Sequence, residues 1–323
     1  MSRRALGVTA KWMAAVLAAL ALLAIPLACA STPAAALEWY EIGNQWFDKG
    51  DWKRAGDAYS RAIALEPDLA GASYNLARAL AEAGDYPAAI RALDRLLARD
   101  PQNVRILAAK AYSHYKAGDS AEALRVYDEV LRLDPYAVDA IYNAALLKSE
   151  AGELEPAAVD LERLVAMKPE DASAFLLLAR VRDKLDRKEE AILAYEKAKE
   201  LGKADAQALE RLGILYGEAR RFAEAMDTLA AATKAEAKRP AAWFALARIR
   251  LTVAEDGTQG MDALRRALEA GFSDREAAAA LLMEPVLAER EAVTKLFEEK
   301  GLTGERQPEG EGTAPEGDGA ATE

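Results

Sequence analysis

The chain has very few of the residues on which catalytic, metal and disulfide chemistry depend. Its 323 residues include one cysteine, Cys29, and one histidine, His114. A disulfide needs two cysteines, and metal sites and nucleophilic catalysis commonly use clustered cysteine and histidine. The sequence also has no phosphate-binding loop and no nucleophile motif. We therefore expect a protein that is not an enzyme, binds no cofactor or metal, and rests on its apolar core alone.

Aromatic residues are also sparse, at 7%, and alternating β-branched segments are missing, whereas hydrophobic residues reach 52%. With abundant alanine and leucine, this composition is typical of an all-α protein. The formal net charge is -11, and no basic stripe occurs. Nucleic acid and anionic lipid surfaces are therefore poor partners, because both are held through clustered lysine and arginine.

The residues that are present follow a pattern with a period of 34. If Ala36 is position 1, the later copies begin at Ala70, Val104, Val138, Ala172, Ala206 and Pro240. Position 8 is small in all seven copies, as Gly43, Ala77, Ala111, Ala145, Ala179, Gly213 and Ala247. Position 20 is alanine in the first six copies, as Ala55, Ala89, Ala123, Ala157, Ala191 and Ala225. A fixed period of this size is typical of a solenoid, in which each unit stacks on its neighbours to bury its apolar face.

Each copy predicts two helices, over about positions 2 to 14 and 18 to 31, because apolar residues recur there at three- and four-residue spacing. The glycine at position 15 of the first four copies is expected to end the first helix in the left-handed conformation. The proline at position 32 of the same copies is expected to end the second helix. Small residues at positions 8 and 20 would let the two helices approach closely.

These positions resemble the tetratricopeptide repeat. In the first copy the matching residues are Trp39, Ile42, Gly43, Trp46, Ala55, Tyr59, Ala62 and Pro67. The resemblance implies an all-α, right-handed superhelical solenoid of helix-turn-helix repeats, with six repeats over residues 36–237. Copies five and six depart from the pattern, because Asp186 and Arg220 replace the glycine and Lys203 and Ala237 replace the proline.

The pattern loosens after Pro240. We expect a degenerate seventh repeat and capping helices over residues 240–300, because the last repeat of a solenoid would otherwise expose an apolar face. The second helix of this copy is expected to be displaced by four residues, with residues 257–260 as an enlarged turn. Residues 301–323 are rich in glycine, glutamate and proline and predict a disordered acidic tail.

The amino terminus has the layout of a secretory signal over residues 1–28, with three basic residues followed by an apolar run. Its end, Ile-Pro-Leu-Ala-Cys at residues 25–29, resembles a bacterial lipobox, although Pro26 stands where that family usually has Leu, Val or Ile. The resemblance implies that Cys29 carries acyl chains such as palmitate and that residues 29–35 tether the repeats to a membrane. More than one chain would hold the protein firmly.

Two alternatives for this segment stay open. Cleavage after Ala30 would release a soluble secreted or periplasmic protein, and an uncleaved apolar run would act as a membrane anchor. Each alternative places the repeats outside the cytoplasm. The expected location is therefore the bacterial cell envelope, facing the periplasm.

In tetratricopeptide proteins, ligands usually lie on the inner face that the first helices form. By this resemblance, the candidate partner-binding residues are Tyr40, Asn44, Tyr74, Asn75, Arg78, Arg105, Tyr112, Tyr115, Tyr142, Asn143 and Arg180. Tyrosine supplies contact area at low entropic cost, asparagine can hold an extended backbone, and arginine can grip a carboxylate. His114 occupies position 11, an aromatic packing position, which favours a structural histidine over a catalytic one.

A narrower resemblance involves the carboxylate clamp of some cytosolic co-chaperones. Asn44, Asn75 and Arg105 match three of its five places, and Tyr40 and Ala109 fail the other two. Asparagine at position 6 is common in the family, so generic groove residues are the favoured interpretation.

These observations support one main hypothesis, a periplasm-facing scaffold whose groove binds an extended peptide or a partner's helix. The rival hypothesis is an accessory lipoprotein of a solute transport system, which would hold a small apolar ligand among the alanine and leucine of copies four to six. A third possibility is that another copy fills the groove and forms a homo-oligomer.

Overall fold

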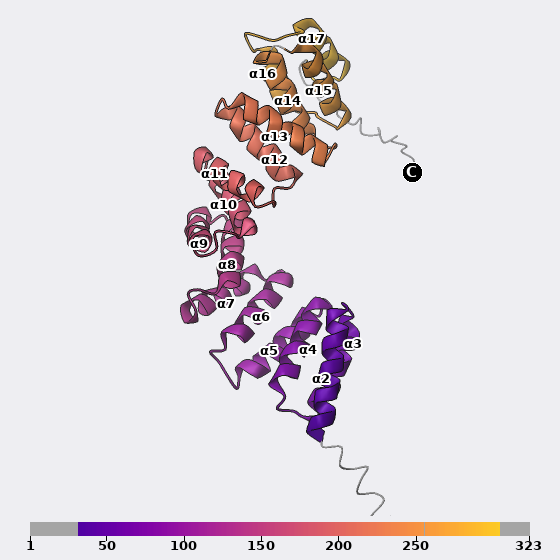
Figure 1. The fold of residues 1–323 in the computed structure, drawn as a ribbon, viewed down its shortest axis with the longest axis vertical. Helices are drawn as coiled ribbons and strands as arrows, with labels where there is room; N and C mark the ends of the chain where they lie inside the picture. The colour runs from indigo at the N-terminus through magenta and orange to yellow at the C-terminus, as the bar shows by residue number, and fades with distance from the viewer. Residues whose placement is uncertain (1–31, 255, 304–323) are drawn as a thin grey trace, which may run out of the picture. The chain divides into compact units, whose positions relative to one another are not determined.

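The computed structural model describes residues 32–254 and 256–303, which form helices and no strand (Figure 1). The predicted signal, Cys29 and residues 304–323 of the predicted tail lie outside these described residues. The chain separates into two compact units, and the division falls after Leu164. The prediction of an all-α fold built from helix pairs is confirmed.

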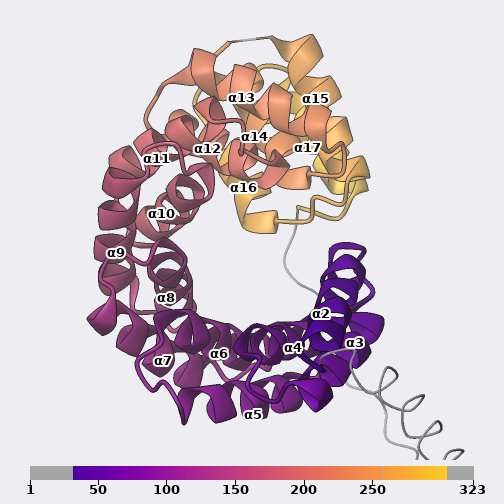
Figure 2. The same cartoon turned by 60° about the horizontal axis from the view of Figure 1, so that its bottom comes forward.

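The first unit contains four helix pairs, one for each of the first four copies. They are α2 (Thr32–Asp48), α3 (Trp52–Leu65), α4 (Ala70–Glu82), α5 (Tyr86–Leu97), α6 (Val104–Lys116), α7 (Ser120–Leu133), α8 (Val138–Glu150) and α9 (Leu154–Met167), the last of which crosses the division. Within this unit the first helices α2, α4, α6 and α8 form one row and the second helices α3, α5 and α7 form another (Figure 2).

The second unit continues with copies five to seven and two further helices. They are α10 (Ala172–Lys184), α11 (Lys188–Glu200), α12 (Ala206–Glu218), α13 (Phe222–Ala235), α14 (Pro240–Thr252), α15 (Gly257–Glu269), α16 (Arg275–Leu282) and α17 (Arg290–Glu299). In copies two to seven, every first helix begins at position 1 and ends at position 13. The 34-residue period therefore sets the helix boundaries directly.

The turn inside each of the first six pairs depends on a left-handed residue at position 15. Gly50, Gly84, Gly118 and Gly152 have φ between 74° and 86°. Asp186 and Arg220 take the same conformation in copies five and six, with φ of 57° and 60°. The turn geometry thus survives the loss of glycine, although a side chain in this conformation is strained.

The small residues allow the two helices of a pair to touch. All the alanines at positions 8 and 20 are fully buried. A Cβ added to Gly43 would lie 2.5 Å from Cδ1 of Tyr59, and one added to Gly213 would lie 2.6 Å from Cγ of Leu229. These two glycines therefore make room for the large residue at position 24 of the opposite helix.

The seventh copy differs from its predicted arrangement. Residues 257–260 do not form an enlarged turn but the first turn of α15, which Asp256 caps by accepting a hydrogen bond from the backbone N–H of Gln259. Gly260, Ala263, Leu264 and Ala267 are buried, one position later than the equivalent residues of α13. The displacement is thus one residue and not four, because Gly260 supplies the close contact with Leu251 that alanine supplies elsewhere.

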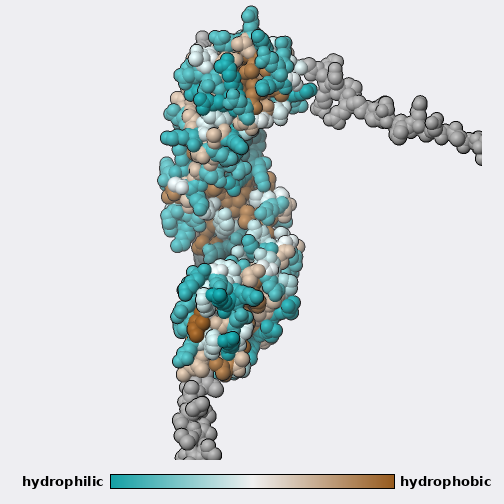
Figure 3. Space-filling model, turned by 90° about the vertical axis from the view of Figure 1, so that its right-hand side faces the viewer, coloured by the Kyte–Doolittle hydropathy of each residue, from teal (hydrophilic) through white to brown (hydrophobic). Residues whose placement is uncertain are grey.

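The chain after the seventh copy packs onto it. The ring of Phe272 stacks on that of Phe244 with centroids 4.0 Å apart, and Val293 and Phe297 of α17 are fully buried. Over the described residues, every helix falls short of the length and apolarity that crossing a bilayer requires. Figure 3 shows a face on which hydrophilic side chains dominate and apolar ones form separate patches.

Candidate functional site

A pocket of about 180 Å³ opens beside α4 and α6 in the first unit. Its lining residues are Tyr74, Ala77, Arg78, Ala81, Glu82, Leu93, Ala109, Tyr112 and Ser113. The residues from α4 recur at three- and four-residue spacing, so one face of that helix forms a wall. Three of the predicted partner-binding residues, Tyr74, Arg78 and Tyr112, therefore meet at one place, which we call the groove pocket.

Two arginines, Arg78 in the groove pocket and Arg105 beside it, lie on aromatic rings. The guanidinium of Arg78 is 4.5 Å from the ring centroid of Phe47, and that of Arg105 is 4.4 Å from the ring centroid of Tyr74. Neither arginine forms an ion pair within residues 32–254 and 256–303. Stacking orients the two guanidinium groups and leaves their N–H donors available to a partner.

A hydrogen-bonded network joins the first two repeats next to this pocket. The Asn44 side-chain oxygen accepts from the Tyr59 hydroxyl at 2.9 Å and from the Asn75 amide at 3.1 Å. The Asn75 amide also lies 3.4 Å from the Tyr40 hydroxyl. Burial, and secondly the neighbouring Tyr40, raises the pKa of Tyr59 to about 12. Asn44 and Asn75 are thus engaged with each other, so they are not arranged as the free amides of a carboxylate clamp.

The equivalent tyrosine of the third repeat has no such partner. Tyr127 is 1% exposed, and its buried hydroxyl forms no hydrogen bond. Position 9 carries Asn44 in the first repeat and Tyr112 in the third, so the amide acceptor is replaced by a phenol. Burial is the main cause that raises the pKa of Tyr127, followed by Tyr112 and Asp139, whereas the Asn143 side chain, which lies nearby but outside hydrogen-bond geometry, lowers it.

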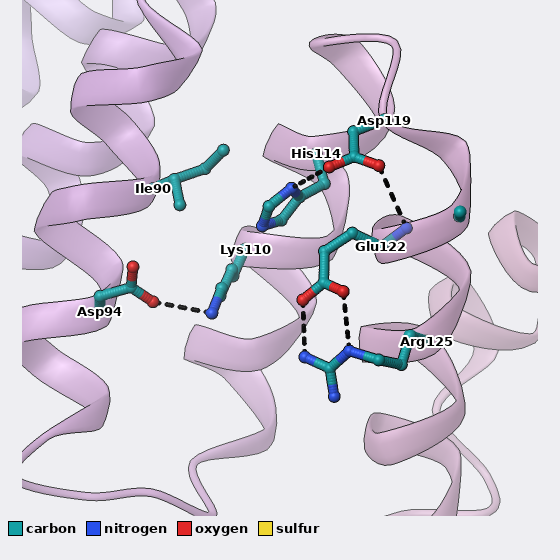
Figure 4. Close-up of a pocket in the computed structure, with 8 residues that line it drawn as sticks. Ile90, Asp94, Lys110, His114, Asp119, Glu122 and Arg125 are labelled. Atoms are coloured by element: carbon teal, nitrogen blue, oxygen red, sulfur yellow. Dashed lines mark hydrogen bonds and ion pairs between the residues drawn. The ribbon is translucent and has the colours of Figure 1, made fainter.

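A second and larger concavity, of about 600 Å³, lies against α5, α6 and α7 around His114 (Figure 4). Here the charged groups face one another in pairs. Lys110 Nζ lies 2.7 Å from Asp94 Oδ1, and Arg125 donates two hydrogen bonds to Glu122. The Arg125 guanidinium, through these bonds, holds the pKa of Glu122 below its usual range.

His114 itself is held inside this concavity. Its Nδ1 lies 3.3 Å from Asp119 Oδ2, its side chain is 14% exposed, and its Nε2 is buried without a hydrogen-bond partner. Since the three acids around it already have cationic or imidazole partners, they offer little to a further charged ligand. Over the described part of the chain, no three His, Cys, Asp or Glu side chains gather as a metal site.

Two family models match the sequence. One, described as the TPR domain of cytochrome c-type biogenesis protein H, matches residues 11–140, and a general tetratricopeptide repeat model matches residues 142–208. Together they span more than half of the chain. The chain is a tetratricopeptide repeat protein. The resemblance inferred from Trp39, Gly43, Ala55 and Pro67 is therefore confirmed.

Solved structures of other tetratricopeptide proteins share the fold. PilF of Pseudomonas aeruginosa matches with a TM-score of 0.58 and 18% identity, over 65% of this chain and 96% of that one. YrrB, described as a TPR protein with an unusual peptide-binding site, matches with a TM-score of 0.53 and 20% identity, over 58% and 96%. A tetratricopeptide protein of Parabacteroides merdae matches with a TM-score of 0.53 and 18% identity, over 76% and 97%. No curated protein sequence matches significantly.

Four further predicted residues of this tetratricopeptide chain lie apart from the groove pocket. Tyr115 packs against a core cluster built around Val126 and Tyr127. Tyr142 and Asn143 are half-buried on α8. Arg180 belongs to the second unit, where it lies 3.7 Å from Asp205. The binding role of all eleven residues stays a prediction.

Six residues that line the groove pocket, Ala77, Ala81, Glu82, Leu93, Ala109 and Ser113, are not among those predicted from the sequence. Glu82 stands at position 13 and Ala109 at position 6 of their repeats, which are inner-face positions of tetratricopeptide repeats, so their spacing could have revealed them. Ser113 and Leu93 stand at positions that usually pack between helices. They reach the pocket because Ala77 and Ala81 are too small to cover them.

Proposed function

We propose that the chain is a non-catalytic scaffold that binds an extended peptide or a partner's helix in the groove of its first unit. The observation that supports this most directly is the groove pocket, where Tyr74, Tyr112 and the stacked Arg78 meet. Tyrosine and arginine are the side chains that most often dominate protein interfaces. A pocket of this size accommodates one side chain of a partner, with the remaining affinity spread along the repeats.

The matching family supports the same proposal. One family model is named for the biogenesis of c-type cytochromes, and the structure of PilW is described as that of a type IV pilus biogenesis factor. Both are assembly processes, in which a scaffold holds other proteins. We further propose that this scaffold faces the periplasm and is held at a membrane by lipid on Cys29. The transport alternative gains no support from Leu176, which is buried, with 9% of its side chain exposed.

Crosslinking in native membranes, followed by purification of the full chain, tests the groove. A variant with Tyr74→Ala, Arg78→Ala and Tyr112→Ala is expected to lose specific partners at least about tenfold, since each removes a buried contact of an interface hot spot. The matched control carries Tyr136→Ala and Arg91→Ala, which remove an exposed tyrosine and an exposed arginine elsewhere in the same unit.

Retention of the same partners by the groove variant, at the level of the control, would show that the groove is not the interface. A third variant, Cys29→Ser, tests the location separately. It is expected to move the protein from the membrane fraction to the soluble fraction, and unchanged membrane association would contradict the lipid tether.

A further inference from the structure

A separate cleft of about 300 Å³ lies in the first unit where α3 ends, α4 begins and α5 ends. It is lined by Ile63, Pro67, Ser73, Leu76, Ala92, Arg95, Leu96 and Arg99. From α4, this cleft is lined by Ser73 and Leu76, whereas the groove pocket is lined by Tyr74, Ala77, Arg78 and Ala81. The two sites therefore use different faces of α4, and we call this one the arginine cleft.

The floor of the arginine cleft is apolar. Leu96 and Ala92 are buried, and Ile63 and Leu76 are partly covered. The Ser73 hydroxyl is the polar group on this side, and it forms no hydrogen bond to any described residue. Such a floor favours hydrocarbon over a sugar or a highly polar group, because buried polar groups without partners are costly.

The rim of the cleft is cationic. Arg95 has no ion-pair partner in the described part of the chain. Arg99 lies 2.8 Å from Asp68, but these side chains are 65% and 80% exposed, so the pair is weak and Arg99 can turn toward a ligand. No Asp or Glu lines the cleft. Two guanidinium groups beside an apolar floor thus present charge of one sign at one end of an apolar space.

We propose that the arginine cleft binds a small monocarboxylate with a compact hydrocarbon tail. The carboxylate lies between Arg95 and Arg99, whose planar forks match its two oxygens. The tail lies over Ile63, Leu76 and Leu96. A dicarboxylate would place its second charge on the apolar floor, and an amine would meet the arginines with like charge. The volume is at the lower end of known ligand pockets, which suits a short chain.

Octanoate is the probe, titrated into the full chain below its micelle concentration. Binding is followed by calorimetry and by the NMR signals of labelled isoleucine and leucine methyl groups. We expect saturable binding at one site, with the largest shifts at Ile63, Leu76 and Leu96. Octanamide and octylammonium have a similar hydrocarbon tail but lack the carboxylate. They are expected to bind at least about tenfold more weakly, because a charge-assisted hydrogen-bonded pair contributes about a factor of ten in affinity.

Two variants on α5 test whether Arg95 binds the carboxylate of octanoate. Arg95→Gln is expected to weaken octanoate binding about tenfold. Arg91→Gln is the matched control, because Arg91 is exposed one turn earlier on the same helix and does not line the cleft. It is expected to leave binding unchanged.

Equal binding of octanoate and octylammonium, equal effects of the two variants, or methyl shifts away from the cleft would overturn the proposal, and so would the absence of saturable binding. The outcome does not depend on the groove, since Tyr112→Ala, which removes a groove residue that does not line the cleft, is expected to leave octanoate binding intact.

Discussion

At the scale of single residues, the tyrosines at position 24 show how a different residue at position 9 changes the hydrogen bonding of a buried hydroxyl. Tyr59 donates to Asn44, whereas Tyr127 has no hydrogen-bond partner for its hydroxyl. A buried hydroxyl without a partner loses its bonds to water and gains nothing in return. The same residue type at the same repeat position therefore contributes stability in one repeat and costs stability in another.

The first prediction follows from this pair of tyrosines. Tyr127→Phe is expected to raise the free energy of unfolding by about 1 kcal/mol, because it removes an unpaired buried hydroxyl. Tyr59→Phe is expected to lower it by about 1 kcal/mol, because it breaks a hydrogen bond and leaves Asn44 with fewer donors. Urea unfolding of both variants measures the difference, and a Tyr127→Phe variant less stable than wild type would contradict the prediction.

The second prediction concerns alkaline pH. Burial, more than any other cause, raises the pKa of Tyr195 to about 12 from an ordinary value of 10.0. The folded state therefore favours the neutral phenol, so this contribution to stability is complete below pH 10 and is lost as pH rises through about 12. Unfolding free energies measured across this range are expected to fall, and to fall less in a Tyr195→Phe variant.

The exposed Tyr136 provides the control for this titration. Tyr136→Phe is expected to leave the alkaline profile as it is in the wild type, because this side chain is 72% exposed. If Tyr195→Phe also had no effect on the slope, its phenol would not be the group that resists ionisation.

At the scale of helices and turns, position 15 shows that different residue types can adopt the same backbone conformation. Four copies reach the left-handed conformation with glycine, whereas two reach it with Asp186 and Arg220. An arginine pays a steric cost there that glycine does not. The turn persists because the two helices on either side of it are fixed by their own buried alanines, which leave the connecting residue no other conformation.

The third prediction uses this strain. Arg220→Gly is expected to stabilise the protein by about 0.5–1 kcal/mol. The relief of backbone strain stabilises the folded state, and the greater freedom of glycine in the unfolded chain offsets part of that gain. The reverse change, Gly118→Ala, is expected to destabilise it by about 1 kcal/mol, since φ of 84° is unfavourable for alanine. Thermal unfolding compares the two, and a destabilising Arg220→Gly together with a stabilising Gly118→Ala would show that this position carries no strain.

The fourth prediction tests the close contact inside a pair. Gly43→Ala would place a methyl group 2.5 Å from the Tyr59 ring, and the ring is fully buried and cannot move freely. We expect a loss of about 1–3 kcal/mol from overpacking. Gly56→Ala is the control, because the nearest atom to its added Cβ is 3.7 Å away in the Leu76 side chain. Comparable losses in both variants would mean that helix spacing does not depend on Gly43.

At the scale of the whole molecule, stability in a solenoid is carried by contacts between neighbouring repeats. Phe272 covers the end of the seventh repeat by stacking on Phe244, and α17 buries Val293 and Phe297. Damage at this end is expected to spread only to adjacent repeats. This differs from a globular domain, in which one core unfolds as a unit.

The fifth prediction follows from that local coupling. Phe272→Ala is expected to increase hydrogen exchange of backbone amides in α14 and α15 by about tenfold or more, because the ring stack is lost at an exposed end. Amides of α6 and α7, in the other unit, are expected to exchange at wild-type rates. Uniform acceleration along the chain would show that the two units unfold cooperatively.

Much of the fold could be predicted from the sequence because the repeat copies agree with one another. Position 8, position 20 and the glycine at position 15 report the same local geometry several times, so a single exception such as Arg220 does not obscure it. The seventh copy was predicted less well. Its shift of one residue depends on Gly260 fitting against Leu251, which is a contact between helices and not a pattern within one of them.

The candidate sites divide in the same way. The inner-face positions of the repeats place Tyr74, Arg78 and Tyr112 on first helices, and the structure brings them together around one pocket. The engagement of Asn44 by Tyr59 and Asn75, and the arginine cleft between Ile63 and Arg95, depend on side chains from three different helices. The sequence by itself therefore determined the helix pairs, their boundaries and their small contact residues, because these are local and repeated. The tertiary structure decided which polar groups are paired and which stay open, because that depends on distances between helices.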